Sequence, residues 1–298
     1  MASLFEIGKS GVQAYRQALS VTGQNIANVN TDGYNKRSAD LEEVPSVQGG
    51  VTNVPDQSGL GVRVNQVRRS FDAFLSSNLR DTNGNYERLD VYVDKLNKLE
   101  NMLLPSDSDL GTFIGRFFSS LQDVASRPDE LSARTVALEN GKALANSFNN
   151  YDNQLKNFKS STHKEIEDDL KVVNSLVDQL VQVNKLIMSG GSKNSSPDIL
   201  DARDQLLLDL SKYINFTVDY GESNDAIVRL GNSGNGKILL ERTDKSVLSS
   251  DIQEGRLIFK VSRNGINSIN NDISSGLLFG AKNFYDFVGE VESEINQL

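Results

Sequence analysis

A glycine-rich segment has part of the spacing of a nucleotide-binding loop. Gly231 to Lys237 (GNSGNGK) matches the Gly-x4-Gly-Lys half of the P-loop, whose backbone amides hold phosphates. However, Ile238 stands where the P-loop carries a Ser or Thr for Mg²⁺, and the segment does not lead into a helix. We therefore expect a hairpin turn, because glycine and asparagine favour tight turns between strands.

A second group places carboxylates beside the only histidine, His163. The acidic run consists of Glu165, Glu167, Asp168 and Asp169. A metal site needs ligands that converge on one point, whereas successive residues of a helix point around its axis. His163 has no role as a proton relay, because no serine or cysteine can be linked to it from the sequence. We expect a solvated helix face with an exposed histidine, and we predict no metal site.

A third group, Asp201, Arg203 and Asp204, lies on a short helix predicted to begin at Asp198. At this spacing the side chains can form surface ion pairs, each worth roughly 0.2–0.5 kcal/mol. They can instead mark a contact between subunits or domains. A polysaccharide-cleaving enzyme would need paired carboxylates in a cleft, and the predicted β region offers no persuasive pair. We predict a protein that is not an enzyme and has no cofactor.

Composition excludes several classes of protein. The chain has 298 residues, enough for two domains, and no cysteine, so disulfides, thiolate zinc sites and cysteine nucleophiles are ruled out. A net charge of −9 without a basic block argues against nucleic acid as a partner. No apolar run approaches the roughly 20 residues that span a bilayer, and the N-terminus lacks the features of a cleaved signal peptide.

The element that positions the N-terminal residues is an amphipathic helix predicted from Leu4 to Val29. Ser3 and Glu6 form a capping box at its start, and the turn-favouring residues 30–33 follow its end. Its stripe of apolar or small residues recurs every three or four positions, at Leu4, Ile7, Gly11, Ala14 or Tyr15, Ala18, Thr22, Ile26 and Val29. Asn25, Asn28 and Asn30 near its end have two interpretations: they set the register of a helix pair, or they are exposed to solvent.

The end of this helix carries a recognisable motif. Asn25-Ile26-Ala27-Asn28 followed by Thr31-x-Gly33-Tyr34 resembles the N-terminal signature of bacterial flagellar rod, hook and hook-associated axial proteins. The resemblance implies an assembly motif formed by Asn25, Ile26, Ala27, Asn28, Thr31, Gly33 and Tyr34. We expect the amides to set register, Gly33 to end the helix with a positive φ, and Tyr34 to anchor the exit from the turn.

A second segment narrows the resemblance. Ile199-Leu200-Asp201-x-Arg203-Asp204-Gln205-Leu206-Leu207, together with long predicted helices, is similar to the hook-associated members that join hook to filament. This implies an extracellular structural subunit of the flagellum that forms a ring and is exported without a cleaved signal peptide. The implied partners are its own copies, the hook protein, a second junction protein and a flagellar export chaperone, but neither nucleic acid nor a membrane.

Long helices are predicted for most of the central chain. Residues 71–103 and 110–124 show helical periodicity, and a third pattern runs from Asp129 to Ile187. The third is either one rod of roughly 90 Å or two helices with a bend near Asn149 and Asn150. We expect the pair within 71–125 to pack along it as a bundle. The helix from Asp198 should bury Leu200, Leu206, Leu207 and Leu210 after a flexible loop at 189–197.

The remaining segments predict strands and a final helix. Residues 35–70 indicate an extended linker that can include a hairpin and that ends in a strand at Val62 to Val67. Short strands are predicted around Phe216 to Val218, Ile227 to Arg229, Ile238 to Leu240 and Leu257 to Val261. A helix follows 275–280 and still presents its apolar face where the chain stops at Leu298. In the resembled family a C-terminal helix returns to pair with the first one, so we expect a truncated chain that assembles poorly.

The predicted fold is mainly α, an elongated helical bundle with long coiled-coil-like helices and a small inserted β domain. We divide it into an N-terminal assembly helix (1–34), an extended linker (35–70), a helical bundle (71–215), a small β domain (216–274) and the start of a returning helix (275–298). Two alternatives to a junction subunit stay open. One is a hook or rod subunit, and the other is a standalone coiled-coil binding module.

Overall fold

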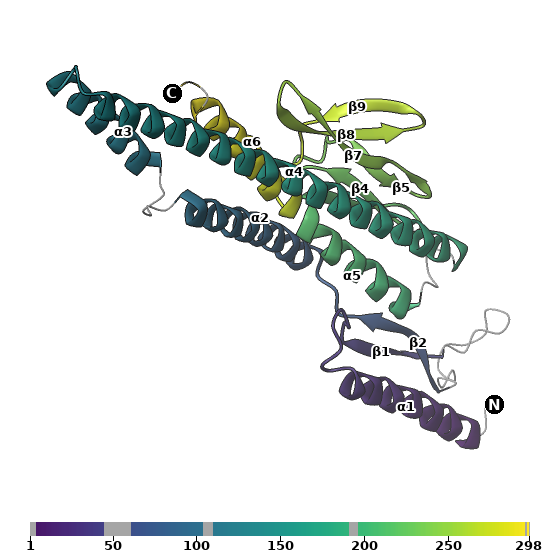
Figure 1. Ribbon diagram of the computed structural model, residues 1–298. Coiled ribbons are helices and arrows are strands. Elements are labelled where there is room, and N and C mark those ends of the chain that lie inside the picture. The colour runs from purple at the N-terminus through teal and green to yellow at the C-terminus, as the bar shows by residue number, and fades with distance from the viewer. Residues whose placement is uncertain (1–3, 45–60, 104–109, 191–195, 296, 298) are drawn as a thin grey trace.

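The structure is a computed structural model that describes residues 4–44, 61–103, 110–190, 196–295 and 297. It is elongated and mainly helical, with small antiparallel sheets, so the predicted fold class is confirmed (Figure 1). The predicted Ser3 cap, the glycines and prolines of 45–60, Pro105 and the loop around 191–195 lie outside the described residues. The helices are α1 (Leu4–Ala27), α2 (Ala73–Leu103), α3 (Leu110–Ser126), α4 (Leu131–Gly190), α5 (Pro197–Tyr213) and α6 (Leu277–Ile295).

The longest element of the described structure is α4, a single helix of 60 residues. It passes through Asn149 and Asn150 as one helix, so of the two predicted alternatives the continuous rod is correct. Its partners change along its length: α3 covers the first part, and α6 and α5 cover the later part (Figure 1). At 1.5 Å per residue it is roughly 90 Å long.

The prediction that α2 and α3 together flank the long helix is wrong for α2. This helix packs on α5 and α6 instead, and α6 lies between it and α4. The reason is the apolar content of α6, because Phe284 and Val288 are fully buried between Leu99 of α2 and Leu155 of α4. A bundle therefore forms, but the last helix supplies its middle layer.

The main core lies where the C-terminal half of α4 meets α5, α6 and the two small sheets. Val173, Leu180, Leu207 and Leu278 are completely or almost completely buried there. The sheets are β3 (Phe216–Tyr220), β4 (Ala226–Leu230), β5 (Ile238–Glu241) and β6 (Asp244–Lys245) in one, and β7 (Val247–Gln253), β8 (Arg256–Arg263) and β9 (Ile266–Asn270) in the other. All four predicted strands are present. β6, β7 and β9 were not predicted, because they are short or polar.

The glycine-rich segment is a turn between antiparallel strands β4 and β5, as predicted. Gly231 and Gly234 adopt φ values of 82° and 71°, which residues with a side chain rarely adopt. The Lys237 ammonium group donates to the carbonyl of Ile269 on β9. The lysine of the P-loop-like sequence is therefore used to tie the two sheets together.

The N-terminal unit consists of α1 and a hairpin of β1 (Arg37–Glu43) and β2 (Val62–Arg69). The strands are antiparallel, from Arg37 opposite Arg69 to Glu43 opposite Val62, with a bulge at Asp40 and Leu41. One face of α1 packs on both strands and buries Ala14 and Val21. The hairpin therefore covers one face of α1 within this chain.

Candidate assembly site

Asn25 fastens the end of α1 to the first residue of β1. Its Oδ1 accepts hydrogen bonds from the backbone N–H of Arg37 and from the hydroxyl of Tyr34, each at 2.9 Å. Its Nδ2 donates to the carbonyl of Arg37 at 2.8 Å. Asn25 is therefore half-buried and its amide is bonded within the chain, so the interpretation that it is exposed to solvent is wrong.

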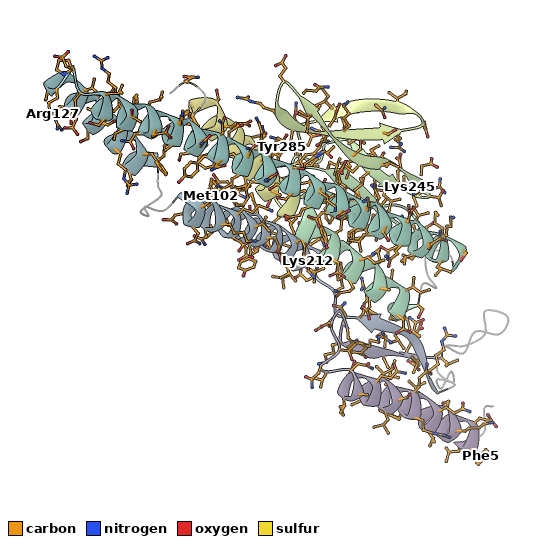
Figure 2. The ribbon with its side chains drawn as sticks, in the orientation of Figure 1. Phe5, Met102, Arg127, Lys212, Lys245 and Tyr285 are labelled. Carbon is orange, nitrogen blue, oxygen red and sulfur yellow. The ribbon has the colours of Figure 1, made fainter. Side chains whose placement is uncertain are left out.

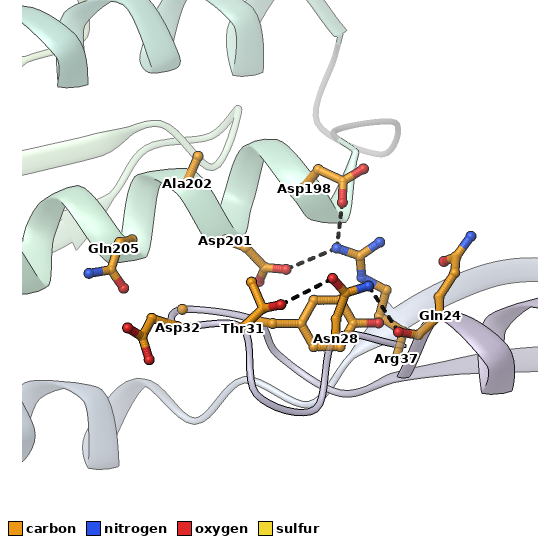
Figure 3. A pocket seen from close by; sticks show the side chains of 11 residues that line it. Gln24, Asn28, Thr31, Asp32, Arg37, Asp198, Asp201, Ala202 and Gln205 are labelled. Atoms are coloured by element: carbon orange, nitrogen blue, oxygen red, sulfur yellow. Dashed lines mark hydrogen bonds and ion pairs between the residues drawn. The ribbon is translucent and has the colours of Figure 1, made fainter. Parts of the chain in front are cut away.

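The other asparagine of the motif caps the helix from within. Asn28 donates from Nδ2 to the carbonyl of Gln24 at 2.9 Å and accepts from the Thr31 hydroxyl at 3.3 Å (Figure 3). These contacts satisfy polar groups where the helical hydrogen bonding stops. Asn30, in the turn that follows, is exposed.

Gly33 has a φ of 76°, so the predicted positive φ is confirmed. A Cβ at this position would lie 2.6 Å from Oε1 of Gln205 on α5, which leaves little space for any side chain. The next residue, Tyr34, bonds to Asn25 and lies beneath the guanidinium group of Arg37, whose carbon is 4.8 Å from the ring centroid. The turn is therefore shaped both by its backbone and by its contact with α5.

The second face of α1 is apolar and uncovered. Its exposed large side chains, which we call the outer seam, are Leu4, Phe5, Val12, Tyr15, Leu19 and Ile26, with Val29 just after the helix. Leu19 and Ile26 are each 70% exposed. These residues follow the three-and-four spacing of a coiled-coil seam and are centred roughly 140° around the helix from the covered face. The single predicted stripe is therefore wrong, because its residues are divided between two faces.

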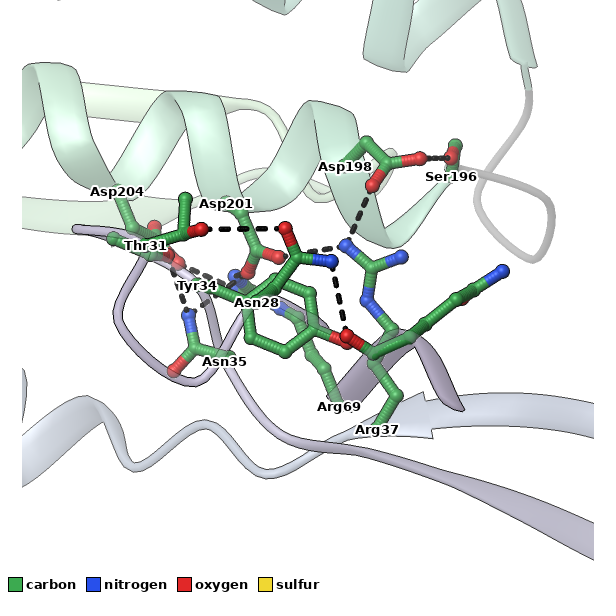
Figure 4. A network of polar contacts seen from close by, with 12 residues as sticks. Asn28, Thr31, Tyr34, Asn35, Arg37, Arg69, Ser196, Asp198, Asp201 and Asp204 are labelled. Atoms are coloured by element: carbon green, nitrogen blue, oxygen red, sulfur yellow. Dashed lines mark hydrogen bonds and ion pairs between the residues drawn. The ribbon is translucent and has the colours of Figure 1, made fainter. Parts of the chain in front are cut away.

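An ionic network, buried except at the exposed Asp198, joins the N-terminal unit to α5 (Figure 4). Arg37 pairs with Asp198 at 2.5 Å and with Asp201 at 3.0 Å, and Arg69 pairs with Asp201 at 2.9 Å and Asp204 at 2.6 Å. Burial lowers the pKa of Arg37, but its hydrogen bonds to Asp198 and Asp201 outweigh burial, so that its pKa is raised. Removing one partner of such a buried pair is strongly destabilising.

The network overturns the prediction that Asp201, Arg203 and Asp204 form surface ion pairs. Asp201 is 8% exposed and Arg203 only 1%. Arg203 pairs with Asp204 at 2.8 Å, donates to the carbonyl of Asn224 at 2.8 Å and covers the ring of Tyr220. Of the predicted buried leucines of α5, Leu207 and Leu210 are buried, whereas Leu200 and Leu206 are only partly so.

A cavity of about 430 Å³ lies between the turn after α1 and α5 (Figure 3). Its walls include Asn28, Thr31 and Tyr34 of the motif and Asp198 and Asp201 of the network. A larger groove of about 710 Å³ runs between α1 and β1, beside Ile26 of the outer seam. Within the described ranges no three His, Asp or Glu side chains are placed to hold a metal ion.

The acidic run on α4 is only partly the solvated face that we expected. Glu165 pairs with Lys95 of α2, and Asp168 pairs with Lys171 one turn along at 2.7 Å. Burial, followed by repulsion from Glu165, raises the pKa of Asp169 to about 6. The prediction that His163 is exposed is wrong, because its ring is half-buried, 6.4 Å from that of Tyr285 between centroids.

The comparisons with known proteins agree with this architecture. Residues 96–298 match the family described as "Flagellar hook-associated protein FlgK helical domain". The chain belongs to this FlgK family. Residues 5–35, which contain α1 and the motif, match "Flagella basal body rod protein".

Curated relatives of the FlgK family carry the name flagellar hook-associated protein 1. The Bacillus subtilis protein is 32% identical over 81% of this chain and 48% of its own length. The Salmonella typhimurium protein is 30% identical over 73% of this chain and 39% of its own length. This chain therefore spans less than half the length of these relatives. A solved structure, the flagellar hook junction protein FlgK from Burkholderia pseudomallei, has the same fold, with a TM-score of 0.62 at 23% identity over 70% of this chain and 38% of that one.

Proposed function

We propose that this chain is a non-enzymatic structural subunit that joins the hook to the filament of the bacterial flagellum. Membership of the FlgK family and the names of its relatives support this role. In this proposal copies of the chain form a ring between the hook protein and a second junction protein. The subunit is extracellular, and it reaches that position with the help of an export chaperone and without a cleaved signal peptide.

The observation that carries an assembly role is the uncovered outer seam of α1. Exposed apolar residues in heptad-like spacing are unfavourable in water and are typical of a surface that packs on another helix. The neighbouring motif holds this helix at a fixed angle, because Asn25 and Tyr34 tie it to β1. We infer that Asn25, Ile26, Ala27, Asn28, Thr31, Gly33 and Tyr34 serve assembly by presenting the seam to a helix of the assembled flagellum.

The match of residues 5–35 to rod proteins favours a second candidate, a rod or hook subunit. It covers α1 and the motif alone, whereas the match to the FlgK helical domain covers the body of the molecule. A standalone binding module is disfavoured because it would leave the outer seam in water.

Among the described residues no helix is both long and apolar enough to cross a bilayer.

Immunogold electron microscopy of isolated hook-filament structures tests the proposal. Antibodies against this chain should label one narrow band between hook and filament, and a strain that lacks its gene should give no label. Gold along the whole hook would instead identify a hook subunit. Structures that carry no gold at any position would contradict both flagellar functions.

A further inference from the structure

Arg80, near the start of α2, is a buried cation without a counter-ion. Arg80 is only 8% exposed, and the Nε atom of its side chain is buried without a hydrogen-bond partner. Among the described residues its side chain forms neither a hydrogen bond nor an ion pair, and the contact that it does make is with the ring of Phe216, 6.0 Å from the guanidinium carbon to the ring centroid. Burial lowers the pKa of Arg80, yet a guanidinium group in a protein stays protonated.

A buried charge of this kind is costly unless an anion compensates it. The other guanidinium groups nearby have such anions: Arg37, Arg69 and Arg203 pair with Asp198, Asp201 and Asp204. Four cations therefore face three carboxylates. Asp204 attracts Arg80 at longer range, but both of its oxygens already contact Arg69 or Arg203. The next residue, Asp81, also attracts Arg80 but is exposed.

A pocket opens beside this unpaired cation. It has a volume of about 220 Å³ and is bounded by the turn at residues 33–35, the beginning of α2 and one face of α5. We call it the Arg80 pocket. Its apolar walls are Phe71, Leu79 and Leu208, and its neutral polar groups include those of Asn35, Ser76 and Gln205. Asp204 also lines the pocket, but its two oxygens form ion pairs with Arg69 and Arg203, so that Arg80 is the charged group of the lining without an ion pair.

The combination of walls and charge defines the ligand. We propose that the Arg80 pocket binds a carboxylate that is carried on an apolar group. The carboxylate accepts hydrogen bonds from the guanidinium group, the geometry that arginine forms best, and the apolar group contacts Phe71 and Leu79. Two sources present this chemistry: an acidic side chain next to a hydrophobic one on a neighbouring subunit, and a free organic acid. The inference does not depend on a role in the flagellum.

Titration of the purified 298-residue chain with benzoate tests the pocket directly, by isothermal calorimetry and by amide NMR shifts. We expect saturable binding with shifts at residues of the turn, α2 and α5, and at least tenfold weaker binding of neutral benzamide. Arg80→Gln should weaken benzoate binding at least tenfold. Arg88→Gln is the matched control, because Arg88 is a half-buried arginine of the same helix that lines another cavity, beside Asp286 and Glu290.

Two outcomes overturn the proposal: no saturable benzoate binding to the natural chain, or equal binding after Arg80→Gln. A stability readout adds an independent test. Without ligand, Arg80→Gln should melt at the same temperature or higher, because it removes an uncompensated charge, and a clear fall would mean that Arg80 is already satisfied within the fold. Analytical ultracentrifugation distinguishes the two sources of the carboxylate. If Arg80→Gln and benzoate both weaken self-association of the chain, a neighbouring subunit supplies the carboxylate. If benzoate binds without weakening self-association, the ligand is a free acid.

Discussion

At the scale of single residues, Asp169 makes the stability of the protein depend on pH. Burial and the nearby Glu165 raise its pKa from 3.8 to about 6, against the opposing attraction of Lys95. At pH values between these two pKa values the folded state binds more protons than the unfolded state, so the free energy of unfolding falls as the pH rises. The stabilisation is complete below the unfolded pKa and is lost as the pH passes through about 6.

Replacing Asp169 by Asn should therefore stabilise the protein at neutral pH. The amide carries no charge to be penalised by burial, and we expect a gain on the order of 1 kcal/mol at about pH 7.5 after allowance for solvent screening. The difference should shrink towards zero at about pH 4, where Asp169 is protonated in the folded chain. Urea unfolding of both proteins at the two pH values measures this, and a gain of equal size at both would contradict it.

The residue types of the motif predicted its backbone conformation better than they predicted which residues contact one another. The positive φ of Gly33 follows from the cluster of turn-favouring residues around it, so the sequence sufficed there. The sequence did not reveal the burial of Asp201, because its partners Arg37 and Arg69 are more than a hundred residues away in the chain. A signal did exist in β1, because the alternation of a strand places Arg37 on the same face as Ala39, which is half-buried.

At the scale of elements, α1 shows why a helix pattern is ambiguous. Apolar residues that recur every three or four positions define a stripe, but two adjacent stripes can be read as one. The hairpin covers the face with Ala14 and Val21, and the outer seam stays open. Similarly, the periodicity of α2 and α6 predicted that they are helices, whereas the order in which they stack depends on fitting side chains such as Phe284 into one layer.

A charge on the outer seam should block assembly without unfolding the subunit. In Leu19→Asp the new carboxylate is solvated in the free chain, since Leu19 is largely exposed, but it would be buried unpaired against a partner helix. We expect unchanged circular dichroism and at least roughly tenfold less incorporation into hook-filament structures. Leu138→Asp on α4, an exposed leucine far along the chain, is the control. Normal incorporation of Leu19→Asp would remove the seam from the assembly surface.

At the scale of the whole molecule, the structure is a long body with the N-terminal unit at one end. Phe5 lies near that end, and Arg127 lies at the opposite tip beside the turn between α3 and α4 (Figure 2). The chain passes from β2 to α2 through Ser70 to Asp72, and Asp72 caps α2 through the amides of Phe74 and Leu75. Apart from this connection, the ionic network with α5 is the main link, so it sets the angle at which the outer seam is presented.

Asp201→Asn should loosen this link, because Asp201 accepts from Asn35, Arg37 and Arg69 at once. The two arginines would then share too little negative charge in a buried site, and we expect the opening free energy of the hairpin to fall by about 3 kcal/mol. Amide hydrogen exchange in β1 and β2 measures this opening, while amides in α4 should keep their protection because the main core is untouched. Asp168→Asn, which breaks the exposed pair with Lys171, should leave the hairpin amides unchanged. If both variants exchanged alike, the angle between the two parts would have to be set by the connecting segment rather than by the network.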